Sequence, residues 1–437
     1  MKLSKHKLGE LIEVTRGASL SGQFYAEEGE LIRLTLGNFN MNGGGFKENT
    51  SKTDLYYTGT VKDEFILNKG DIITPLTEQS LGLLGTTARI PENGKYIQSQ
   101  DVALVKCKEG LLDPNFCYYL ISSSIVRQQL SAGAQQTKIR HTSPDKIKDC
   151  TVWVPEFEEQ KRIGRILTDI DEKITLNRQI NDNLEAMAKQ LYDYWFVQFD
   201  FPNEEGKPYK SSGGTMVYNE KLKREIPQGW HCYELNKWLE IKSGFAFKSE
   251  TYISKGKFKV VTIKNVQDHH LDTSSCDYVY EIPQGMKEWC SLSVNDRLIS
   301  LTGNCGRLCI VTENDLLLNQ RVGLLACNDE YIDYAYLLLS SEEYQTLSNN
   351  LAKGAAQANL SPVDLCKNIA VLPKLDVLEK FNRQIKPIVA SYIQNEIQIA
   401  ELTKQRDELL PLLMNGQATV NYHLSVFVSP FILYIET

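Results

Sequence analysis

Residues 163–195 read IGRILTDIDEKITLNRQINDNLEAMAKQLYDYW, and residues 381–413 read FNRQIKPIVASYIQNEIQIAELTKQRDELLPLL. In each stretch, mainly apolar residues recur in alternating steps of four and three, and the two series match at a constant offset of 218 residues. The first series is Ile163, Leu167, Ile170, Ile174, Asn177, Asn181, Leu184, Ala188, Leu191 and Trp195. The second is Phe381, Ile385, Ile388, Tyr392, Asn395, Ile399, Leu402, Arg406, Leu409 and Leu413. This spacing is typical of a coiled-coil seam and predicts two long helices that pack antiparallel.

Two polar features interrupt the apolar seam. Asn177 and Asn395 occupy equivalent positions, and a buried amide costs stability unless another polar group pairs with it. We therefore expect the two amides to be partners, although a slight rotation of each helix would instead turn them to solvent. Pro387 lacks a backbone donor, so we expect the second helix to begin or kink there, after a separate short helix from Lys374 to Lys386.

The sequence on either side of the helices also repeats. Residues 70–77, GDIITPLT, resemble residues 295–302, NDRLISLT, and both alternate as strands do. Three further matches follow in the same order: 100–102 with 320–322, 133–136 with 354–357, and 143–155 with 361–373. The chain is therefore predicted to contain one structural plan twice, related by a pseudo-two-fold repeat.

The repeat and the helices together predict an α+β (mixed) fold with two domains separated by two long antiparallel helices. The predicted divisions are domain 1–155, helix 156–200, linker 201–227, domain 228–373, helix 374–416 and a tail 417–437 that adds one more strand. The linker assignment rests on its density of Pro, Gly and polar residues.

The bulk composition restricts the class of protein. A chain of 437 residues with 42% hydrophobic residues can bury more than one core, and a net charge of -7 argues against a protein that coats nucleic acid nonspecifically. The N-terminal residues show no secretory signal, and no apolar run approaches the roughly 18 residues of a membrane span, so we expect a cytoplasmic protein with no membrane association.

No motif for catalysis, cofactor or metal binding stands out. The chain lacks the Asn-Pro-Pro-Tyr type loop of amino-methyltransferases and the Gly-Lys-Ser or Gly-Lys-Thr of a Walker loop. The acidic start of Glu159-Gln160-Lys161 is better explained as a helix N-terminus than as a nuclease site. The ten cysteines are scattered, and Cys305 and Cys309 lack the usual zinc spacing, so we expect reduced core thiols and no metal.

Four segments resemble the specificity subunits of Type I restriction-modification enzymes. They are WFVQFDFP at 195–202, GKPYKSSGG at 206–214, IPQGW at 226–230 and QRDELLPLLMNG at 405–416. The resemblance implies a subunit without an active site or cofactor that reads a bipartite site in double-stranded DNA. It also implies two methyltransferase subunits that use S-adenosylmethionine, and restriction subunits that use ATP and Mg²⁺, as partners.

Two other functional classes stay open at this point. The chain could be the targeting part of a self-contained nuclease or methyltransferase that has lost its catalytic region. It could also be a coiled-coil scaffold that carries carbohydrate- or protein-binding domains. The DNA sequence that each domain would read cannot be derived from the residues.

The candidate DNA contacts lie in three loops of each predicted domain, because base readout needs fixed side chains with paired hydrogen-bonding groups. The glutamine loops carry most weight, since they recur in both copies beside glycines, although Gln136 and Gln357 could equally cap the element that follows. In the first domain the candidates are Arg16, Ser19, Thr77, Gln79, Gln135, Gln136, Lys138 and Arg140. In the second they are Lys242, Lys248, Thr302, Asn304, Arg307, Gln357 and Asn359.

Overall fold

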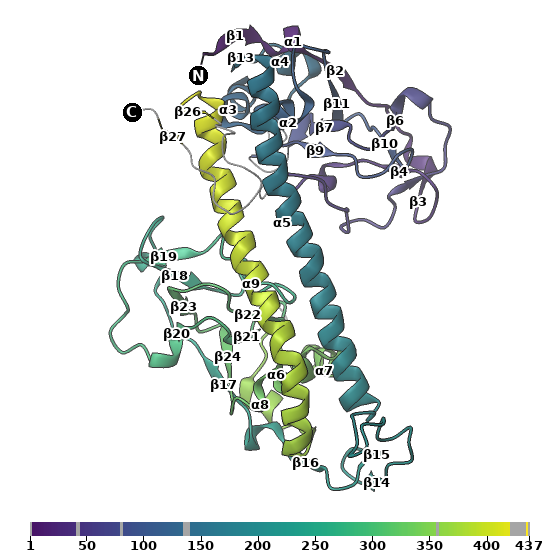
Figure 1. Ribbon diagram of the computed structural model, residues 1–437, viewed down its shortest axis with the longest axis vertical. Coiled ribbons are helices and arrows are strands. Elements are labelled where there is room, and N and C mark those ends of the chain that lie inside the picture. The colour runs from purple at the N-terminus through teal and green to yellow at the C-terminus, as the bar shows by residue number, and fades with distance from the viewer. Residues whose placement is uncertain are drawn as a thin grey trace. The chain divides into compact units, whose positions relative to one another are not determined.

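The computed structural model describes residues 2–40, 44–78, 82–133, 140–354 and 358–419, together with the backbone of residues 434–435. The chain forms two compact units, one from residues 1–175 and 401–437 and the other from residues 176–400. Two long helices, α5 (Phe157–Tyr192) and α9 (Leu375–Met414), contribute to both units (Figure 1). Their bounds agree closely with the helices predicted at 156–200 and 374–416, and α5 continues into a π-helical turn, Asp193–Val197.

The first unit is built on two small sheets. A four-stranded sheet has the order β2-β11-β7-β9, and a five-stranded sheet has the order β3-β5-β4-β10-β6. The strands are β1 (Ser4–Lys7), β2 (Ile12–Arg16), β3 (Tyr25–Ala26), β4 (Ile32–Arg33), β5 (Tyr56–Tyr57), β6 (Ile66–Leu67), β7 (Ile72–Pro75), β8 (Thr77–Glu78), β9 (Ala88–Arg89), β10 (Tyr96–Ile97), β11 (Val102–Cys107), β12 (Arg140–His141) and β13 (Thr151–Val154). The short helices are α1 (Leu8–Leu11), α2 (Pro114–Ser122), α3 (Ser124–Gly133) and α4 (Pro144–Lys148).

The second unit repeats this plan. Its four-stranded sheet has the order β17-β24-β21-β22, and a second sheet has the order β19-β18-β23-β20. The strands are β16 (His231–Glu234), β17 (Glu240–Ser243), β18 (Phe258–Val261), β19 (Asp277–Val279), β20 (Ser291–Leu292), β21 (Arg297–Ser300), β22 (Leu308–Ile310), β23 (Leu316–Leu318), β24 (Val322–Ala326) and β25 (Ile369–Leu372). The helices are α6 (Ile332–Ser340), α7 (Glu342–Leu351) and α8 (Pro362–Cys366).

Local hydrogen bonds confirm that the two copies share one design. Thr35 and Thr262 each begin a short turn in which the backbone amide donates to the Oδ1 of the Asn three residues later, at 2.9 and 2.8 Å. Those residues, Asn38 and Asn265, are buried, and each amide nitrogen also donates to a backbone carbonyl. Because a buried amide must have its partners to be tolerated, the repeated Thr-x-x-Asn pattern fixes the same turn in both halves.

The predicted antiparallel packing of the helices is confirmed within the second unit. Asn177 on α5 donates to Gln398 Oε1 at 2.7 Å, whereas Asn181, one turn later, donates to Glu396 Oε1 at 2.7 Å and to the carbonyl of Tyr392. Residue numbers therefore rise along α5 as they fall along α9. Among the described residues, the first seam is buried at eight of its ten positions, and Leu184 and Leu191 are half-buried.

The predicted pairing of Asn177 with Asn395 is wrong. Asn395 Nδ2 donates to Asn181 Oδ1 at 3.0 Å, and Asn177 pairs with Gln398 instead. In antiparallel helices, a residue and its equivalent 218 positions later face each other at only one height along the pair. Asn177 and Asn395 lie away from that height. The amide nearest to Asn395 across the seam is therefore Asn181, which lies one turn after Asn177 on α5.

Two other expectations differ from the structure. α9 continues through Pro387 as one helix, because Pro387 is exposed and water can satisfy the carbonyl that loses its helical donor. The predicted linker 201–227 contains a hairpin, β14 (Met216–Asn219) with β15 (Arg224–Pro227), and Phe201 and Ile226 are buried in the core of the second unit. In the tail, β26 (Ala418–Thr419) pairs with β27 (Tyr434–Ile435).

Candidate nucleic-acid interface

The predicted contact loops of each domain follow one edge of its four-stranded sheet. β2 and β7 both run antiparallel to β11, so they are parallel to each other, and Arg16, Ala103 and Thr74 form one row near their ends. In the second domain, β17 and β21 both run antiparallel to β24 in the same way. In the first domain, the loops after β2 and β7 therefore leave from the same edge of the sheet. In the second domain, the loops after β17 and β21 likewise leave from one edge of their own sheet. Separate segments of sequence can then build one contact surface.

In the second domain, hydrogen bonds hold the loops at this edge together. Thr302 and Asn359 form an antiparallel bridge, and the Thr302 hydroxyl donates to Asn359 Oδ1 at 2.9 Å. The amide of Gly303 donates to the carbonyl of Ala358 at 2.9 Å. Asn304 and Asn359 are exposed beside this bridge. The two loops, held together by these hydrogen bonds, therefore present two side-chain amides. A side-chain amide is the group that reads adenine in a major groove.

Arg307 lies in the same cluster and is held by two residues that the sequence analysis missed. Its Nη1 donates to Gln267 Oε1 at 3.0 Å, and its Nε lies 3.3 Å from a carboxylate oxygen of Asp268. The partners come from a loop about 40 positions upstream, so no spacing in the sequence could have identified them. The Arg307 side chain is 29% exposed, which leaves part of a fixed guanidinium, paired with Asp268, at the surface of the loop cluster.

The corresponding cluster of the first domain is centred on a buried carboxylate. Glu78 is 1% exposed and accepts the backbone amides of Gly82, Leu83 and Leu84 at 3.0–3.1 Å. Arg140 pairs with it at 3.3 Å across the β8–β12 ladder. A buried carboxylate needs these partners, so Arg140 has a structural role in addition to any contact with DNA.

Exposure divides the remaining candidates. Arg16, Ser19 and Lys248 are exposed, and Lys242 is half-buried over the ring of Trp289 at 5.3 Å. Thr77 and Thr302, by contrast, are only 6% and 5% exposed. Such burial does not fit direct contact with a base, and the two threonines are better explained as supports for the loops that follow them. Contact of any of these residues with DNA stays a prediction.

Five of the predicted contact residues lie outside the described part of the chain. They are Gln79, Gln135, Gln136, Lys138 and Gln357. The segments that flank them are described, and β8, β12 and residues 358–360 belong to the loop clusters above. The choice between DNA contact and capping for the two glutamine loops therefore stays open.

Arginines that anchor a helix to the sheet were also missed. Arg89 Nη2 donates to Asn115 Oδ1 at 2.8 Å and lies over the ring of Tyr118. In the second domain, Arg297 Nη2 donates to Asp333 Oδ1 at 2.7 Å and lies over the ring of Tyr336. The helix residues Asn115 and Tyr118 match Asp333 and Tyr336 at the offset of 218, so the repeat could have indicated them. The arginines come from different strands, β9 and β21, and the repeat could not have indicated those.

The described residues contain no candidate cluster of metal ligands. Within ranges 2–40, 44–78, 82–133, 140–354 and 358–419, no cluster of three His, Cys, Asp or Glu side chains could hold a metal ion. Burial raises the pKa of the Cys309 thiol, which disfavours the thiolate needed for nucleophilic chemistry. In the same part of the chain, no helix combines the length and apolar character that crossing a bilayer requires.

Comparisons with known proteins agree with the geometry. The sequence model of the Type I restriction modification DNA specificity domain matches residues 2–186 and 227–406. The chain is 27% identical to the Type I restriction enzyme MjaIX specificity subunit of Methanocaldococcus jannaschii, over 72% of this chain and 71% of that protein. It is 22% identical to the HindI specificity subunit of Haemophilus influenzae, over 75% and 84% of the two chains.

A solved structure shows the same fold. The crystal structure of the S subunit of a Type I restriction-modification system from M. genitalium aligns over 95% of this chain and 96% of its own, with a TM-score of 0.58 and 17% identity. Matched domains in both halves, in a fold shared with a known S subunit, account for the internal repeat. The chain therefore belongs to the family of Type I restriction-modification specificity subunits, with a copy of the DNA specificity domain in each half.

Proposed function

We propose that each half of the chain reads one part of a bipartite site in double-stranded DNA, and that the chain itself is not catalytic. The observation that carries this proposal is the repeated set of loops at the edge of a four-stranded sheet, once in each specificity domain. In the second domain, these loops present Asn304, Asn359 and Arg307, which are side chains of the kind that read base edges.

The long helices suit a site with a nonspecific spacer. α5 has 36 residues, which at a rise of about 1.5 Å per residue corresponds to a length of about 54 Å. One turn of duplex measures about 34 Å. A pair of such helices therefore supports the reading of two separated half-sites, and it does not require the intervening bases to be contacted.

In this proposal, catalysis belongs to partner subunits in the cytoplasm. Two methyltransferase subunits would use S-adenosylmethionine, and restriction subunits would use ATP and Mg²⁺. The relatives are named as specificity subunits, which favours this assignment over a nuclease or methyltransferase that has lost its catalytic region. It is also favoured over a scaffold with carbohydrate- or protein-binding domains.

An exposed apolar stripe on α5 supports the docking of a methyltransferase subunit there. Leu176, Ile180 and Met187 are 55%, 39% and 52% exposed and follow one another at helical spacing. Exposed apolar side chains in a row are typical of an interface that another protein covers. We propose that this stripe, with the segment 201–227, receives the methyltransferase subunit.

A pull-down tests the docking proposal. The triple variant Leu176→Asn, Ile180→Gln and Met187→Gln should lose most association with the co-expressed methyltransferase subunit. Glu172→Gln with Lys173→Gln, exposed on the same helix, serves as the matched control. Association that is unchanged in the triple variant contradicts docking on this stripe.

Methylome sequencing tests the reading of DNA. In a strain that carries the chain with its methyltransferase subunit, the methylated sites should share two short motifs separated by a spacer of fixed length. Asn304→Ala with Asn359→Ala should relax one motif and leave the other unchanged, with a loss of about 1–3 kcal/mol for each good base contact. A single continuous motif, or equal relaxation of both halves, contradicts the proposal.

A separate assay distinguishes the alternatives. Methyl transfer to DNA by the isolated chain with labelled S-adenosylmethionine would favour the enzyme. Failure to retard any duplex in the presence of the methyltransferase subunit would favour the scaffold.

A further inference from the structure

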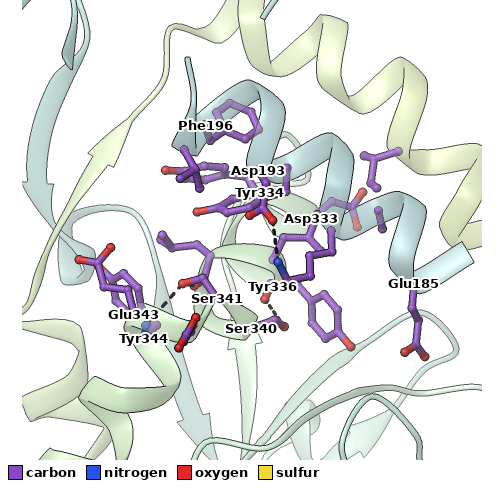
Figure 2. Close-up of a pocket in the computed structure, with 18 of the residues that line it drawn as sticks. Glu185, Asp193, Phe196, Asp333, Tyr334, Tyr336, Ser340, Ser341, Glu343 and Tyr344 are labelled. Atoms are coloured by element: carbon purple, nitrogen blue, oxygen red, sulfur yellow. Dashed lines mark hydrogen bonds and ion pairs between the residues drawn. The ribbon is translucent and has the colours of Figure 1, made fainter. Parts of the chain in front are cut away.

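A cavity of about 670 Å³ lies inside the second unit, separate from the loops at the sheet edge. Most of the residues around it come from the C-terminal part of α5, from α6 and the start of α7, and from the N-terminal half of α9 (Figure 2). The others include Arg224, His269, Ile310 and residues 369–371. Six aromatic side chains contribute to the wall: Tyr192, Phe196, Tyr334, Tyr336, Tyr344 and Tyr392. A cavity of this size and character is in the range of sites that bind small organic molecules.

The internal repeat explains why this space is open. In the first unit, Arg406 Nη1 donates to Asp171 Oδ1 at 2.9 Å, and the Tyr119 hydroxyl donates to Asp171 Oδ2 at 2.7 Å. These three polar side chains link α2, α5 and α9 in the first unit.

At the offset of 218 residues, the same positions in the second unit hold shorter or apolar side chains. Ala188 corresponds to Arg406, Val389 to Asp171, and Leu337 to Tyr119, and all three line the cavity. At these three positions, the second unit therefore lacks the guanidinium–carboxylate pair of the first, although Arg224 from β15 also lines the cavity.

Two polar groups on the cavity wall have no partner in the described chain. The Tyr192 side chain is only 5% exposed, yet its hydroxyl makes no hydrogen bond to any described residue. Glu185, one turn before Ala188 on α5, is half-buried and makes neither a hydrogen bond nor an ion pair there. The Tyr192 hydroxyl and the partly desolvated Glu185 carboxylate are therefore available to accept hydrogen bonds from a bound donor.

The electrostatics of the wall favour a cation. Burial, followed by the nearby carboxylates of Asp182 and Glu396, raises the pKa of Glu185 to about 7. A bound positive charge would stabilise the ionised carboxylate. The faces of tyrosine and phenylalanine rings attract cations as well. The acidic side chains on the wall, which include Glu343, outnumber the basic ones, Lys189 and Arg224, so the wall favours a cation over an anion.

We propose that this cavity binds a small organic cation, an amidinium, guanidinium or amine carried on an apolar body. The cationic group takes the place that Arg406 fills in the first unit, and Glu185 serves as its counter-charge. The apolar body packs against the aromatic wall. This binding site is independent of the proposed reading of DNA.

Calorimetric titration of the purified full-length chain tests the proposal. Biphenyl-4-carboxamidine is the cationic probe, and biphenyl-4-carboxamide is its neutral match in shape. Because a hydrogen bond to a charged group contributes about 1.5–3 kcal/mol, the amidine should bind about tenfold more tightly or better. Glu185→Gln should remove this advantage and leave the affinity for the carboxamide unchanged.

A filling variant locates the site. Ala188→Arg restores the side chain found in the first unit and should abolish the binding of both probes, whereas Glu172→Gln on the exposed surface of α5 should change neither. If Ala188→Arg does not fold, as judged by circular dichroism, Glu185→Gln carries the test alone. Equal affinity for the two probes, binding unaffected by Glu185→Gln, or no binding at about 1 mM would overturn the proposal.

Discussion

Replacement of Asn181 should destabilise the helix pair more than replacement of Asn177, although both amides lie in the same buried seam. Asn181 is 4% exposed, donates to the Glu396 carboxylate at 2.7 Å and accepts from Asn395 at 3.0 Å. Asn177 is 6% exposed, and its side chain makes one hydrogen bond, to the neutral amide of Gln398 at 2.7 Å.

The magnitudes follow from the partners that each variant leaves behind. Asn181→Ala loses a hydrogen bond to a charged group, about 1.5–3 kcal/mol, and a neutral one with Asn395, about 1 kcal/mol. The contact with the Tyr392 carbonyl, at 3.5 Å, is too long to add much. Asn177→Ala loses only a neutral one, again about 1 kcal/mol. We therefore expect Asn181→Ala to cost about 2.5–4 kcal/mol, roughly 2 kcal/mol more than Asn177→Ala.

The assay must resolve the second unit, because a chain with two compact units need not unfold in one step. Hydrogen exchange of amides in residues 176–192 and 385–400 reports the opening free energy of this segment directly. A double-mutant cycle of Asn181→Ala with Glu396→Gln should give a coupling of about 1.5 kcal/mol or more. Equal losses for Asn177→Ala and Asn181→Ala, or a coupling near zero, would refute the reasoning.

Three further predictions concern the core, the pH dependence and a close backbone contact. Asp333→Ala should destabilise the second unit by about 3–5 kcal/mol in urea unfolding, because Arg297, 1% exposed, would remain as a buried unpaired charge; a loss below about 1 kcal/mol would contradict this. The hydrogen bond that the His270 ring donates to the Glu396 carboxylate raises the pKa of His270 above its usual 6.5. The stabilisation from this pair should be complete below about pH 6.5 and disappear as the pH rises through the folded-state pKa. Unfolding measured at several pH values should show this loss in the parent chain and not in His270→Gln. Gly244→Ala would place a Cβ 2.3 Å from the carbonyl oxygen of Leu318 and should lower the melting temperature, whereas Gly133→Ala, with no atom within 4 Å, should not.

Much of the architecture could be predicted from the sequence, because it depends on periodicity. Steps of four and three place Ile163, Leu167 and Ile170 on one side of a helix whatever lies opposite, and all three are buried. The strand 72–75 and its equivalent 297–300 were likewise visible as alternating patterns beside matching turns. Periodicity does not show which residues of the two helices meet, however. The partner of Asn395 was therefore predicted one turn away from its true position.

The candidate site was predicted less completely, because its surroundings come from distant segments. The residues of the loops after β7 and β21 were identified by chemical type, but burial of Thr77 and Thr302 could not be read from type alone. Nor could the pairing of Arg140 with Glu78, or that of Arg307 with Asp268. Charge neutralisation within the protein depends on which loops the fold brings within about 4 Å of each other.

The sequence by itself determined the repeat, the two seams and the residue types at each sheet edge, since these follow from local spacing and from the comparison of one half with the other. Only the tertiary structure decided which seam amides pair, which arginines are neutralised, and that Ala188 lines a cavity whereas its equivalent, Arg406, pairs with Asp171. The physical reason is that packing and electrostatic pairing act between groups that are close in space, and the distance between such groups along the chain carries no signal of their contact.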